Sequence, residues 1–388
     1  MKNYKIGKTL LTNRSNAPQK IKPNKSSLKS IVEYDNIGEF IDSAFIPEFT
    51  PETPEIYKYS FPPRCKYQEN QTKNEYKQAE TDSFAYWKQQ QPKIPFEKNI
   101  EIWRQFWITC ERSDLILQIV DARSPLFYFN SDILKVYPNK KHVILINKCD
   151  LINNFSVWEE YFKNIDVDVI FHSCITGQAF VNGNQISLCE YLIKYNMNIG
   201  LVGYPNVGKS STINSIFKQK KVQVSKTPGK TKHIQTLVFN ETGILISDCP
   251  GLIFSKHTKS QLLLNGALNA DQIMDIRGSL VDVVEYIGVS SILKYYKITG
   301  FINDSRNTPA WNLVYAMAKN ENFDCGKYIK QIVKDYMEGK LTRSENNDLE
   351  VTHEWFYEKK EISDRTTRRI TKRAARKLLK VSRVNEVK

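Results

Sequence analysis

The segment from residue 203 to 210 constrains the fold more than any other part of the chain. It reads Gly-Tyr-Pro-Asn-Val-Gly-Lys-Ser, after an apolar run typical of a strand (197–202) and before a run typical of a helix (210–219). A glycine loop between a strand and a helix N-terminus presents backbone N–H groups to an anion. We expect Lys209 to reach the β- and γ-phosphates and the Ser210 hydroxyl to coordinate magnesium. The motif predicts a nucleotide phosphate site on an α/β sheet.

Two further motifs come directly after apolar runs. Asp248-Cys249-Pro250-Gly251 follows 243–247, and its aspartate can hold magnesium through water while the Gly251 N–H meets a γ-phosphate. Asn147-Lys148-Cys149-Asp150 follows 143–146. The Asp150 carboxylate can accept from the ring N–H and the amino group of guanine together, and adenine offers no such pair. Alone, each motif has an ordinary reading, such as an Asx turn at Asp150. Their joint occurrence at three strand ends favours one GTP site.

The order of these motifs is unusual. In ordinary GTPases the phosphate loop precedes the guanine-reading NKxD sequence, whereas here NKCD at 147–150 precedes both the phosphate loop and DCPG at 248–251. The strand end His172-Ser173-Cys174 lies between them and can offer backbone N–H groups to guanine O6. This order predicts a circular permutation, which a sheet tolerates because chain termini lie at the surface and the core contacts are unchanged.

The remaining sequence predicts the organisation around this site. Short β-rich runs alternate with helical patterns, which indicates an α/β fold with a mostly parallel sheet and helices on both faces. Five prolines between 47 and 63 indicate an extended chain. We expect four parts: an extended, mostly non-globular basic arm (1–97), the permuted GTPase domain (98–256), a smaller helical domain (257–345) and a basic C-terminal tail with an RNA-binding helix (346–388).

Charge and composition limit the partners. The net charge is +14, and the first 30 residues hold eight basic residues and no acidic one, while 363–388 hold ten basic and two acidic. Such tails predict a polyanionic partner, with solubilisation as the ordinary alternative. No apolar run approaches the length of a membrane span or a secretory signal. Seven cysteines without a CxxC pair favour a reducing compartment.

Segments outside the nucleotide motifs carry a family resemblance. They are GKTLLTNR (7–14), FPPR (61–64), IPFEKNIEIWRQFWITCERSD (94–114), IVDARSPLFYF (119–129), TPGKTKHIQT (227–236) and LLLNGALNADQIMD (262–275). With the three motifs, the chain resembles the circularly permuted GTPases of ribosome assembly, and within them the eukaryotic cytoplasmic large-subunit GTPases.

The resemblance implies a function. It implies GTP hydrolysis during late cytoplasmic maturation of the large ribosomal subunit, with release of the nuclear export adaptor. The implied partners are large-subunit rRNA and proteins, with no membrane and a monomer off the ribosome. The alternatives are a GTP-regulated rRNA-binding checkpoint factor with incidental hydrolysis, or a nucleolar large-subunit assembly GTPase.

The resemblance also implies a set of site residues. Those for GTP or GDP are Asn147, Lys148, Asp150, Ser173, Cys174, Asn206, Val207, Gly208, Lys209, Ser210, Ser211, Asp248 and Gly251. The magnesium set is Ser210, Asp248 and the switch threonine Thr231, for which Thr227 is the alternative. The catalytic set is Lys209, Thr231, Gly251 and Asn206.

One catalytic position departs from the common pattern. Many GTPases place a glutamine directly after DxxG to orient water, but this chain has Leu252. We therefore expect slow hydrolysis alone and stimulation by the ribosomal subunit. In similar GTPases the asparagine matched by Asn206 helps to hold potassium; the alternative is that it only braces the loop.

The sequence allows more than one role for each of two further segments. The run 363–384 predicts a basic helix that favours RNA over membranes or calmodulin-like proteins, and a nuclear localisation signal is a further interpretation. The strand end Asp121-Ala122-Arg123-Ser124-Pro125 is either a structural turn or an rRNA contact.

Overall fold

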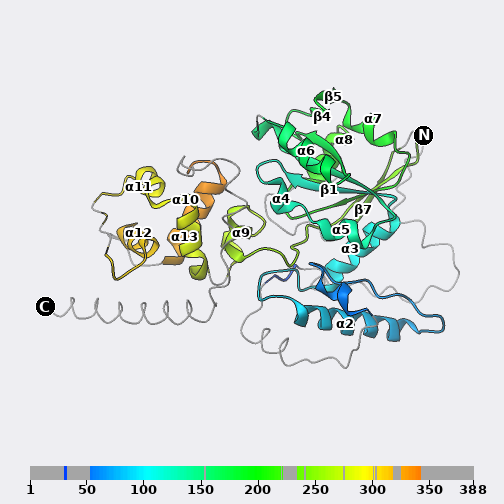
Figure 1. The fold of residues 1–388 in the computed structure, drawn as a ribbon, viewed down its shortest axis with the longest axis horizontal. Helices are drawn as coiled ribbons and strands as arrows, with labels where there is room; N and C mark the ends of the chain where they lie inside the picture. The colour runs from blue at the N-terminus through cyan, green and yellow to red at the C-terminus, as the bar shows by residue number, and fades with distance from the viewer. Residues whose placement is uncertain are drawn as a thin grey trace. The chain divides into compact units, whose positions relative to one another are not determined.

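An eight-stranded sheet occupies the centre of the first of two units (Figure 1). The computed structural model describes residues 30–32, 53–152, 154–219, 221, 234–239, 242–273, 276–299, 301, 304–317 and 325–341. It divides the chain into Met1–Thr258 and Lys259–Lys388, two residues beyond the expected boundary.

The sheet has the strand order β5-β4-β3-β2-β1-β6-β8-β7. The strands are β1 (Leu115–Asp121), β2 (Lys141–Asn147), β3 (Asp168–His172), β4 (Ala179–Val181), β5 (Asn184–Ile186), β6 (Ile199–Val202), β7 (Gln235–Val238) and β8 (Leu245–Asp248). The five strands β1, β2, β3, β6 and β8 are parallel, and β4, β5 and β7 pair antiparallel. This mixed but mostly parallel sheet confirms the predicted α/β class.

The register aligns the carboxyl ends of the parallel strands. Asp121 of β1 pairs with Asn147 of β2, which pairs with His172 of β3. On the other side, Leu201 of β6 pairs with Asp248 of β8. All seven residues of β1 are buried, as expected for a central strand covered on both faces. The three predicted strand-end motifs consequently leave the sheet at one edge.

Helices flank the sheet. They are α3 (Ile100–Arg112), α4 (Pro125–Tyr128), α5 (Ser131–Val136), α6 (Ser156–Asn164), α7 (Leu188–Ile193) and α8 (Lys209–Ile216), with the short 3-10 helix η2 (Cys149–Leu151) after β2. Helix α3 lies against β6, where a Cβ on Gly200 would stand 2.4 Å from the Ser113 Oγ. The side chain of Asn99 caps α3 by accepting from the Glu101 N–H.

The segment before α3 corrects the expectation of a non-globular arm over 1–97. Residues 53–97 contain the 3-10 helix η1 (Pro54–Lys58) and α2 (Lys73–Gln90), and α3 lies between α2 and the sheet (Figure 1). The described part of the proline-rich stretch begins with η1 and is therefore not extended throughout. Phe61, which follows η1, is 1% exposed, stacks on Trp103 and meets Phe106 edge-on. Residues 1–29 and 33–52 lie outside the described part.

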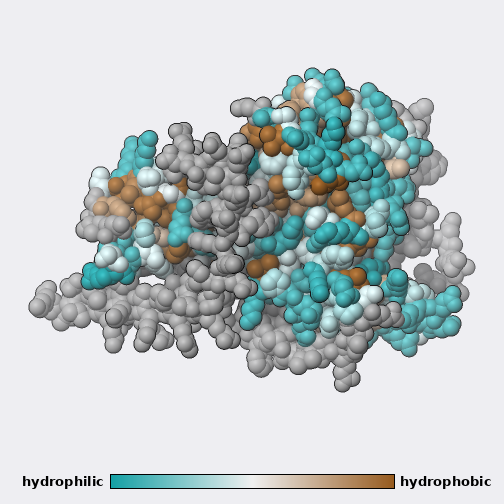
Figure 2. Space-filling model, in the orientation of Figure 1, coloured by the Kyte–Doolittle hydropathy of each residue, from teal (hydrophilic) through white to brown (hydrophobic). Residues whose placement is uncertain are grey.

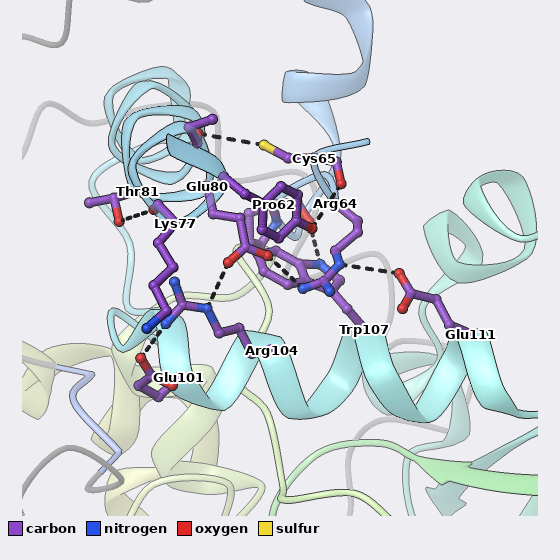
Figure 3. Close-up of polar contacts among 12 residues, drawn as sticks. Pro62, Arg64, Cys65, Lys77, Glu80, Thr81, Glu101, Arg104, Trp107 and Glu111 are labelled. Atoms are coloured by element: carbon purple, nitrogen blue, oxygen red, sulfur yellow. Dashed lines mark hydrogen bonds and ion pairs between the residues drawn. The ribbon is translucent and has the colours of Figure 1, made fainter. Parts of the chain in front are cut away.

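A buried carboxylate joins α2 to α3 (Figure 3). Glu80 of α2 is 3% exposed and accepts from the Arg64 Nη1 at 2.6 Å and from the Arg104 Nε at 2.9 Å. The Arg64 guanidinium also lies over the Trp107 ring, 5.2 Å from its centroid. A buried carboxylate is stable only when paired, and Glu80 has both of its oxygens paired. The FPPR sequence therefore fastens the N-terminal segment to α3.

The second unit is helical in its described residues. Its elements are α9 (Lys259–Leu264), η3 (Ala270–Gln272), η4 (Arg277–Ser279), α10 (Leu280–Ile287), α11 (Val289–Tyr295), α12 (Pro309–Met317) and α13 (Cys325–Met337). They bury their own core, which includes Leu263, Val284, Leu313 and Ile332. Among the described residues of both units, no helix has the length and apolar character needed to cross a bilayer. Hydrophilic residues cover most of the described surface visible in Figure 2.

Candidate nucleotide-binding site

The phosphate loop connects β6 to α8 in a backbone conformation that requires its glycines. Gly203 has φ 147° and Gly208 has φ 102°, both in the region that favours glycine. A Cβ on Gly203 would lie 2.5 Å from the Ile119 carbonyl oxygen, and one on Gly208 would lie 2.1 Å from the Asn147 Nδ2. The two glycines therefore allow the loop to approach both β1 and the end of β2.

Lys209 is the first residue of α8, and its side chain reaches back into this loop. Its side chain is buried, and its Nζ donates to the carbonyl oxygens of Gly203 at 2.9 Å and Tyr204 at 2.6 Å. Burial lowers the pKa of Lys209 to about 8, although the negative charge of Asp248 acts to raise it. At neutral pH the ammonium remains mainly protonated, and it gives the loop a fixed positive charge beside its backbone N–H groups.

Ser210 and Asp248 provide oxygen atoms suited to magnesium. The Ser210 Oγ donates to the Asp248 Oδ2 at 2.7 Å, so the hydroxyl and the carboxylate already face one another. The Asp248 Oδ1 is buried and has no hydrogen-bond partner among the residues that the structure describes. The pKa of Asp248 is raised, because the effect of burial outweighs the opposite effects of the Ser210 hydroxyl and the Lys209 charge. A hydroxyl beside a buried carboxylate with an unsatisfied oxygen fits a hard divalent cation. Among the described residues there is no cluster of three or more His, Cys, Asp or Glu ligands.

The NKCD segment contacts the phosphate loop directly. The Asn147 Nδ2 donates to the Val207 carbonyl oxygen at 2.8 Å, and the Lys148 Nζ donates to the Asn206 carbonyl oxygen at 3.1 Å. Asn147 is buried, and its hydrogen bond joins the two loops. These contacts place the predicted guanine and phosphate residues side by side.

The Ser173-Cys174 turn joins the same cluster. The Cys174 Sγ donates to the Asn147 Oδ1 at 3.2 Å. The Ser173 Oγ accepts from the backbone N–H groups of Ile175 and Thr176, which shapes the turn after β3. Asp150 is exposed at η2, on the segment that Asn147 and Lys148 fasten to the phosphate loop.

The DCPG segment lies against the other side of the loop. A Cβ on Gly251 would lie 2.8 Å from the Pro205 Cα, and the Leu252 N–H donates to the Gly203 carbonyl oxygen at 3.2 Å. The Leu252 side chain is fully buried. Thr231 and Thr227 lie outside the described residues, and Ser211 follows Ser210 in α8.

The segment that leaves DCPG is tied to the N-terminal segment. The Glu97 N–H donates to the Ile253 carbonyl oxygen at 2.9 Å, and the Ser255 N–H donates to the Ser60 carbonyl oxygen at 2.9 Å. Phe254 between them is fully buried and contacts the Tyr204 ring of the phosphate loop, with centroids 5.3 Å apart. The sequence predicted the motif but not this attachment.

Asp121 is a site residue whose role the sequence left open. It is 1% exposed, and its Oδ2 accepts from the Lys148 Nζ at 2.5 Å. Arg123 pairs with both carboxylate oxygens. In the sequence, a role at the site was indicated only by the position of Asp121 at the end of an apolar run, just before the run that leads to NKCD.

Comparisons with known proteins agree with this geometry. A family model described as "50S ribosome-binding GTPase" matches residues 198–312, which include the phosphate loop and DCPG. The chain is 31% identical to "Large subunit GTPase 1" of Schizosaccharomyces pombe, over 73% of this chain and 58% of that protein. The protein of the same name in Saccharomyces cerevisiae is 31% identical, over 72% of this chain and 56% of that protein.

The chain resembles the circularly permuted GTPases in the order of its motifs. If the strands are counted from β6, the phosphate loop follows the first strand and DCPG the third, and NKCD follows the fifth, which is the order of the motifs in an ordinary GTPase. A GDP-bound structure of TM YlqF is similar at 22% identity and a TM-score of 0.40, covering 64% of this chain and all of that one. The chain spans a little over half the length of the two yeast relatives.

Proposed function

We propose that the chain binds GTP and hydrolyses it to GDP and phosphate, with magnesium as cofactor. The contact that carries this proposal is the Asn147 side chain, which donates to the Val207 carbonyl oxygen and accepts from the Cys174 thiol. It brings together the loops proposed for the phosphates and for guanine. Magnesium, when bound, neutralises the developing charge on the phosphates.

Each residue has a proposed part in this reaction. Lys209 and the loop N–H groups bind the phosphates, while Ser210 and Asp248 hold magnesium. Asn147, Lys148, Asp150 and the Ser173-Cys174 turn bind guanine. Thr231, or Thr227 in its place, completes the magnesium site, and the Gly251 N–H meets the γ-phosphate. Asn206 is proposed to help hold a potassium ion.

The base preference gives a direct prediction for Asp150→Asn. An amide nitrogen donates where guanine also donates, so affinity for GTP is expected to fall about tenfold to a hundredfold, the range for hydrogen bonds to a charged group. Xanthine carries a carbonyl at that position and accepts from the amide, so affinity for XTP is expected to rise. Titration of fluorescent GTP and XTP analogues measures both affinities. Asp166→Asn, an exposed aspartate in the turn after α6, is the matched control. Unchanged base preference in Asp150→Asn would contradict the assignment.

We infer that the substrate of this cycle is the large ribosomal subunit. The names of the relatives and the two basic ends of the chain support this inference. By resemblance, the chain acts on the late cytoplasmic subunit as a monomer with no membrane association, and GTP hydrolysis releases an assembly factor, the nuclear export adaptor.

The buried Leu252 predicts how turnover depends on the surroundings. An aliphatic side chain cannot orient water, so we expect slow turnover alone and stimulation of at least about tenfold by large subunits in potassium, from added electrostatic stabilisation. Phosphate release is measured in potassium and in sodium, each with and without subunits. Equal rates in all four conditions would contradict activation by potassium and by large subunits.

The same leucine favours a second candidate function. A site without a water-orienting side chain suits a factor whose rRNA binding is gated by GTP, with hydrolysis incidental. Subunit binding that requires GTP, without multiple turnover on subunits, would support this checkpoint role over the assembly GTPase. A nucleolar site of action is the further alternative.

A further inference from the structure

We propose that Asp121 is a positioning residue for the guanine nucleotide, which holds Lys148 across the phosphate loop while Arg123 fixes the Asp121 carboxylate. The proposal rests on the proposed GTP-binding function. It assigns the Asp121-Ala122-Arg123 sequence to the nucleotide site, a role that differs from both the structural turn and the rRNA contact that the sequence left open.

The first step is the burial of the Asp121 carboxylate. Asp121 ends β1 with 1% of its side chain exposed, and a carboxylate in that position is costly unless it is paired. Its Oδ1 accepts from the Arg123 N–H and Nε, both at 3.0 Å, and its Oδ2 accepts from the Arg123 Nη2 at 2.7 Å. Burial raises its pKa, but the Arg123 hydrogen bonds and the Lys148 charge outweigh burial and keep the pKa below the usual value. The group is therefore a fixed anion at neutral pH.

The second step is the conformation of Lys148. Its backbone has φ 63°, in the left-handed region that is uncommon for lysine. Its Nζ donates both to the Asp121 Oδ2 and to the Asn206 carbonyl oxygen. One ammonium thus joins the end of β1 to the phosphate loop, and the side chain runs from β2 to reach them.

The third step is the place of this bridge in the sheet. From β1 the chain goes to β2 and β3 on one side, and later to β6 and β8 on the other side. The crevice beside such a switch point, at the carboxyl ends of the strands, is where open α/β sheets bind their ligands. The Asp121–Lys148 pair lies at this point, beside the phosphate loop.

The fourth step concerns Arg123. Its side chain is 42% exposed, yet its guanidinium binds both oxygens of Asp121, in the bidentate geometry that fixes a carboxylate most strongly. These hydrogen bonds turn the guanidinium toward the carboxylate that Lys148 uses. This arrangement favours a role inside the nucleotide site over a phosphate contact with rRNA.

The test is the variant Asp121→Asn, which keeps the shape of the side chain and removes its charge. Loss of a charge-assisted hydrogen bond to Lys148 is expected to speed dissociation of a fluorescent GDP analogue about tenfold. We expect KM for GTP to rise more than kcat falls, because the groups at the γ-phosphate keep their contacts. Asp114→Asn, which changes an exposed aspartate just before the opposite end of β1, is the matched control.

A double-mutant cycle separates positioning from general support of the fold. If Asp121 acts through Lys148, the effect of Asp121→Asn on GDP dissociation disappears in a Lys148→Ala background. An equal effect in both backgrounds, or wild-type dissociation in Asp121→Asn, overturns the proposal. If Asp121→Asn does not fold, Arg123→Ala takes its place, with an expected twofold to threefold faster dissociation from the loss of a partly exposed partner, about 0.5 kcal/mol. Unchanged dissociation in that variant counts against the proposal.

The wild-type measurement distinguishes this proposal from the proposed function. A wild-type chain that does not bind the GDP analogue contradicts the function, and the positioning role falls with it. A wild-type chain that binds the analogue, with Asp121→Asn indistinguishable from it, contradicts the positioning role alone.

Discussion

Lys209→Ala is expected to lower the rate of GTP hydrolysis about a hundredfold to a thousandfold, the cost of removing one preorganised charge from a transition state. The Lys209 Nζ is the buried cation at the centre of the phosphate loop, where it donates to the Gly203 and Tyr204 carbonyl oxygens. Release of phosphate under saturating GTP, with large subunits present, measures the effect.

The control for this variant is Lys163→Ala, which removes an exposed lysine from the last turn of α6. It is expected to hydrolyse GTP at the wild-type rate. Lys209→Ala with more than half of the wild-type rate would show that the phosphates bind elsewhere, and would contradict the whole nucleotide site.

Phe61→Ala is expected to destabilise the first unit by about 3–5 kcal/mol, the usual cost of deleting a buried aromatic side chain. Phe61 is 1% exposed, and its ring contacts Trp103, Phe106 and Phe254, with centroids 5.2–6.5 Å apart. The unfolding temperature is expected to fall by about 10 °C, given the shift per kcal/mol of a domain of this size. Thermal unfolding followed by circular dichroism measures it.

Tyr67→Ala is the matched control for Phe61→Ala. Tyr67 belongs to the same N-terminal segment but is 64% exposed, so its loss is expected to cost no more than about 0.5 kcal/mol. If the two variants unfold at the same temperature, residues 53–97 are not part of the fold, and the expectation of a non-globular arm stands.

The nucleotide motifs and the fold class followed from the sequence because their chemistry is local. A phosphate loop needs glycines at fixed positions, since only they permit the backbone of Gly203 and Gly208 beside Ile119 and Asn147. The apolar runs predicted the central strands, and strand ends in a parallel sheet share one edge. The permuted order needed no structure, because it is written in the order of the motifs.

The N-terminal segment and the bridge at Lys148 depended on contacts between residues far apart in the chain. Helix α2 carries mainly polar residues, and the contacts that hold it include the ion pairs of Glu80, whose partners Arg64 and Arg104 lie 16 and 24 residues away. Asp121 meets Lys148 only because β1 and β2 pair in one register. Local patterns record which residues can form a loop or a strand, whereas the pairing of a buried charge is decided by packing, and here only the tertiary structure supplied it.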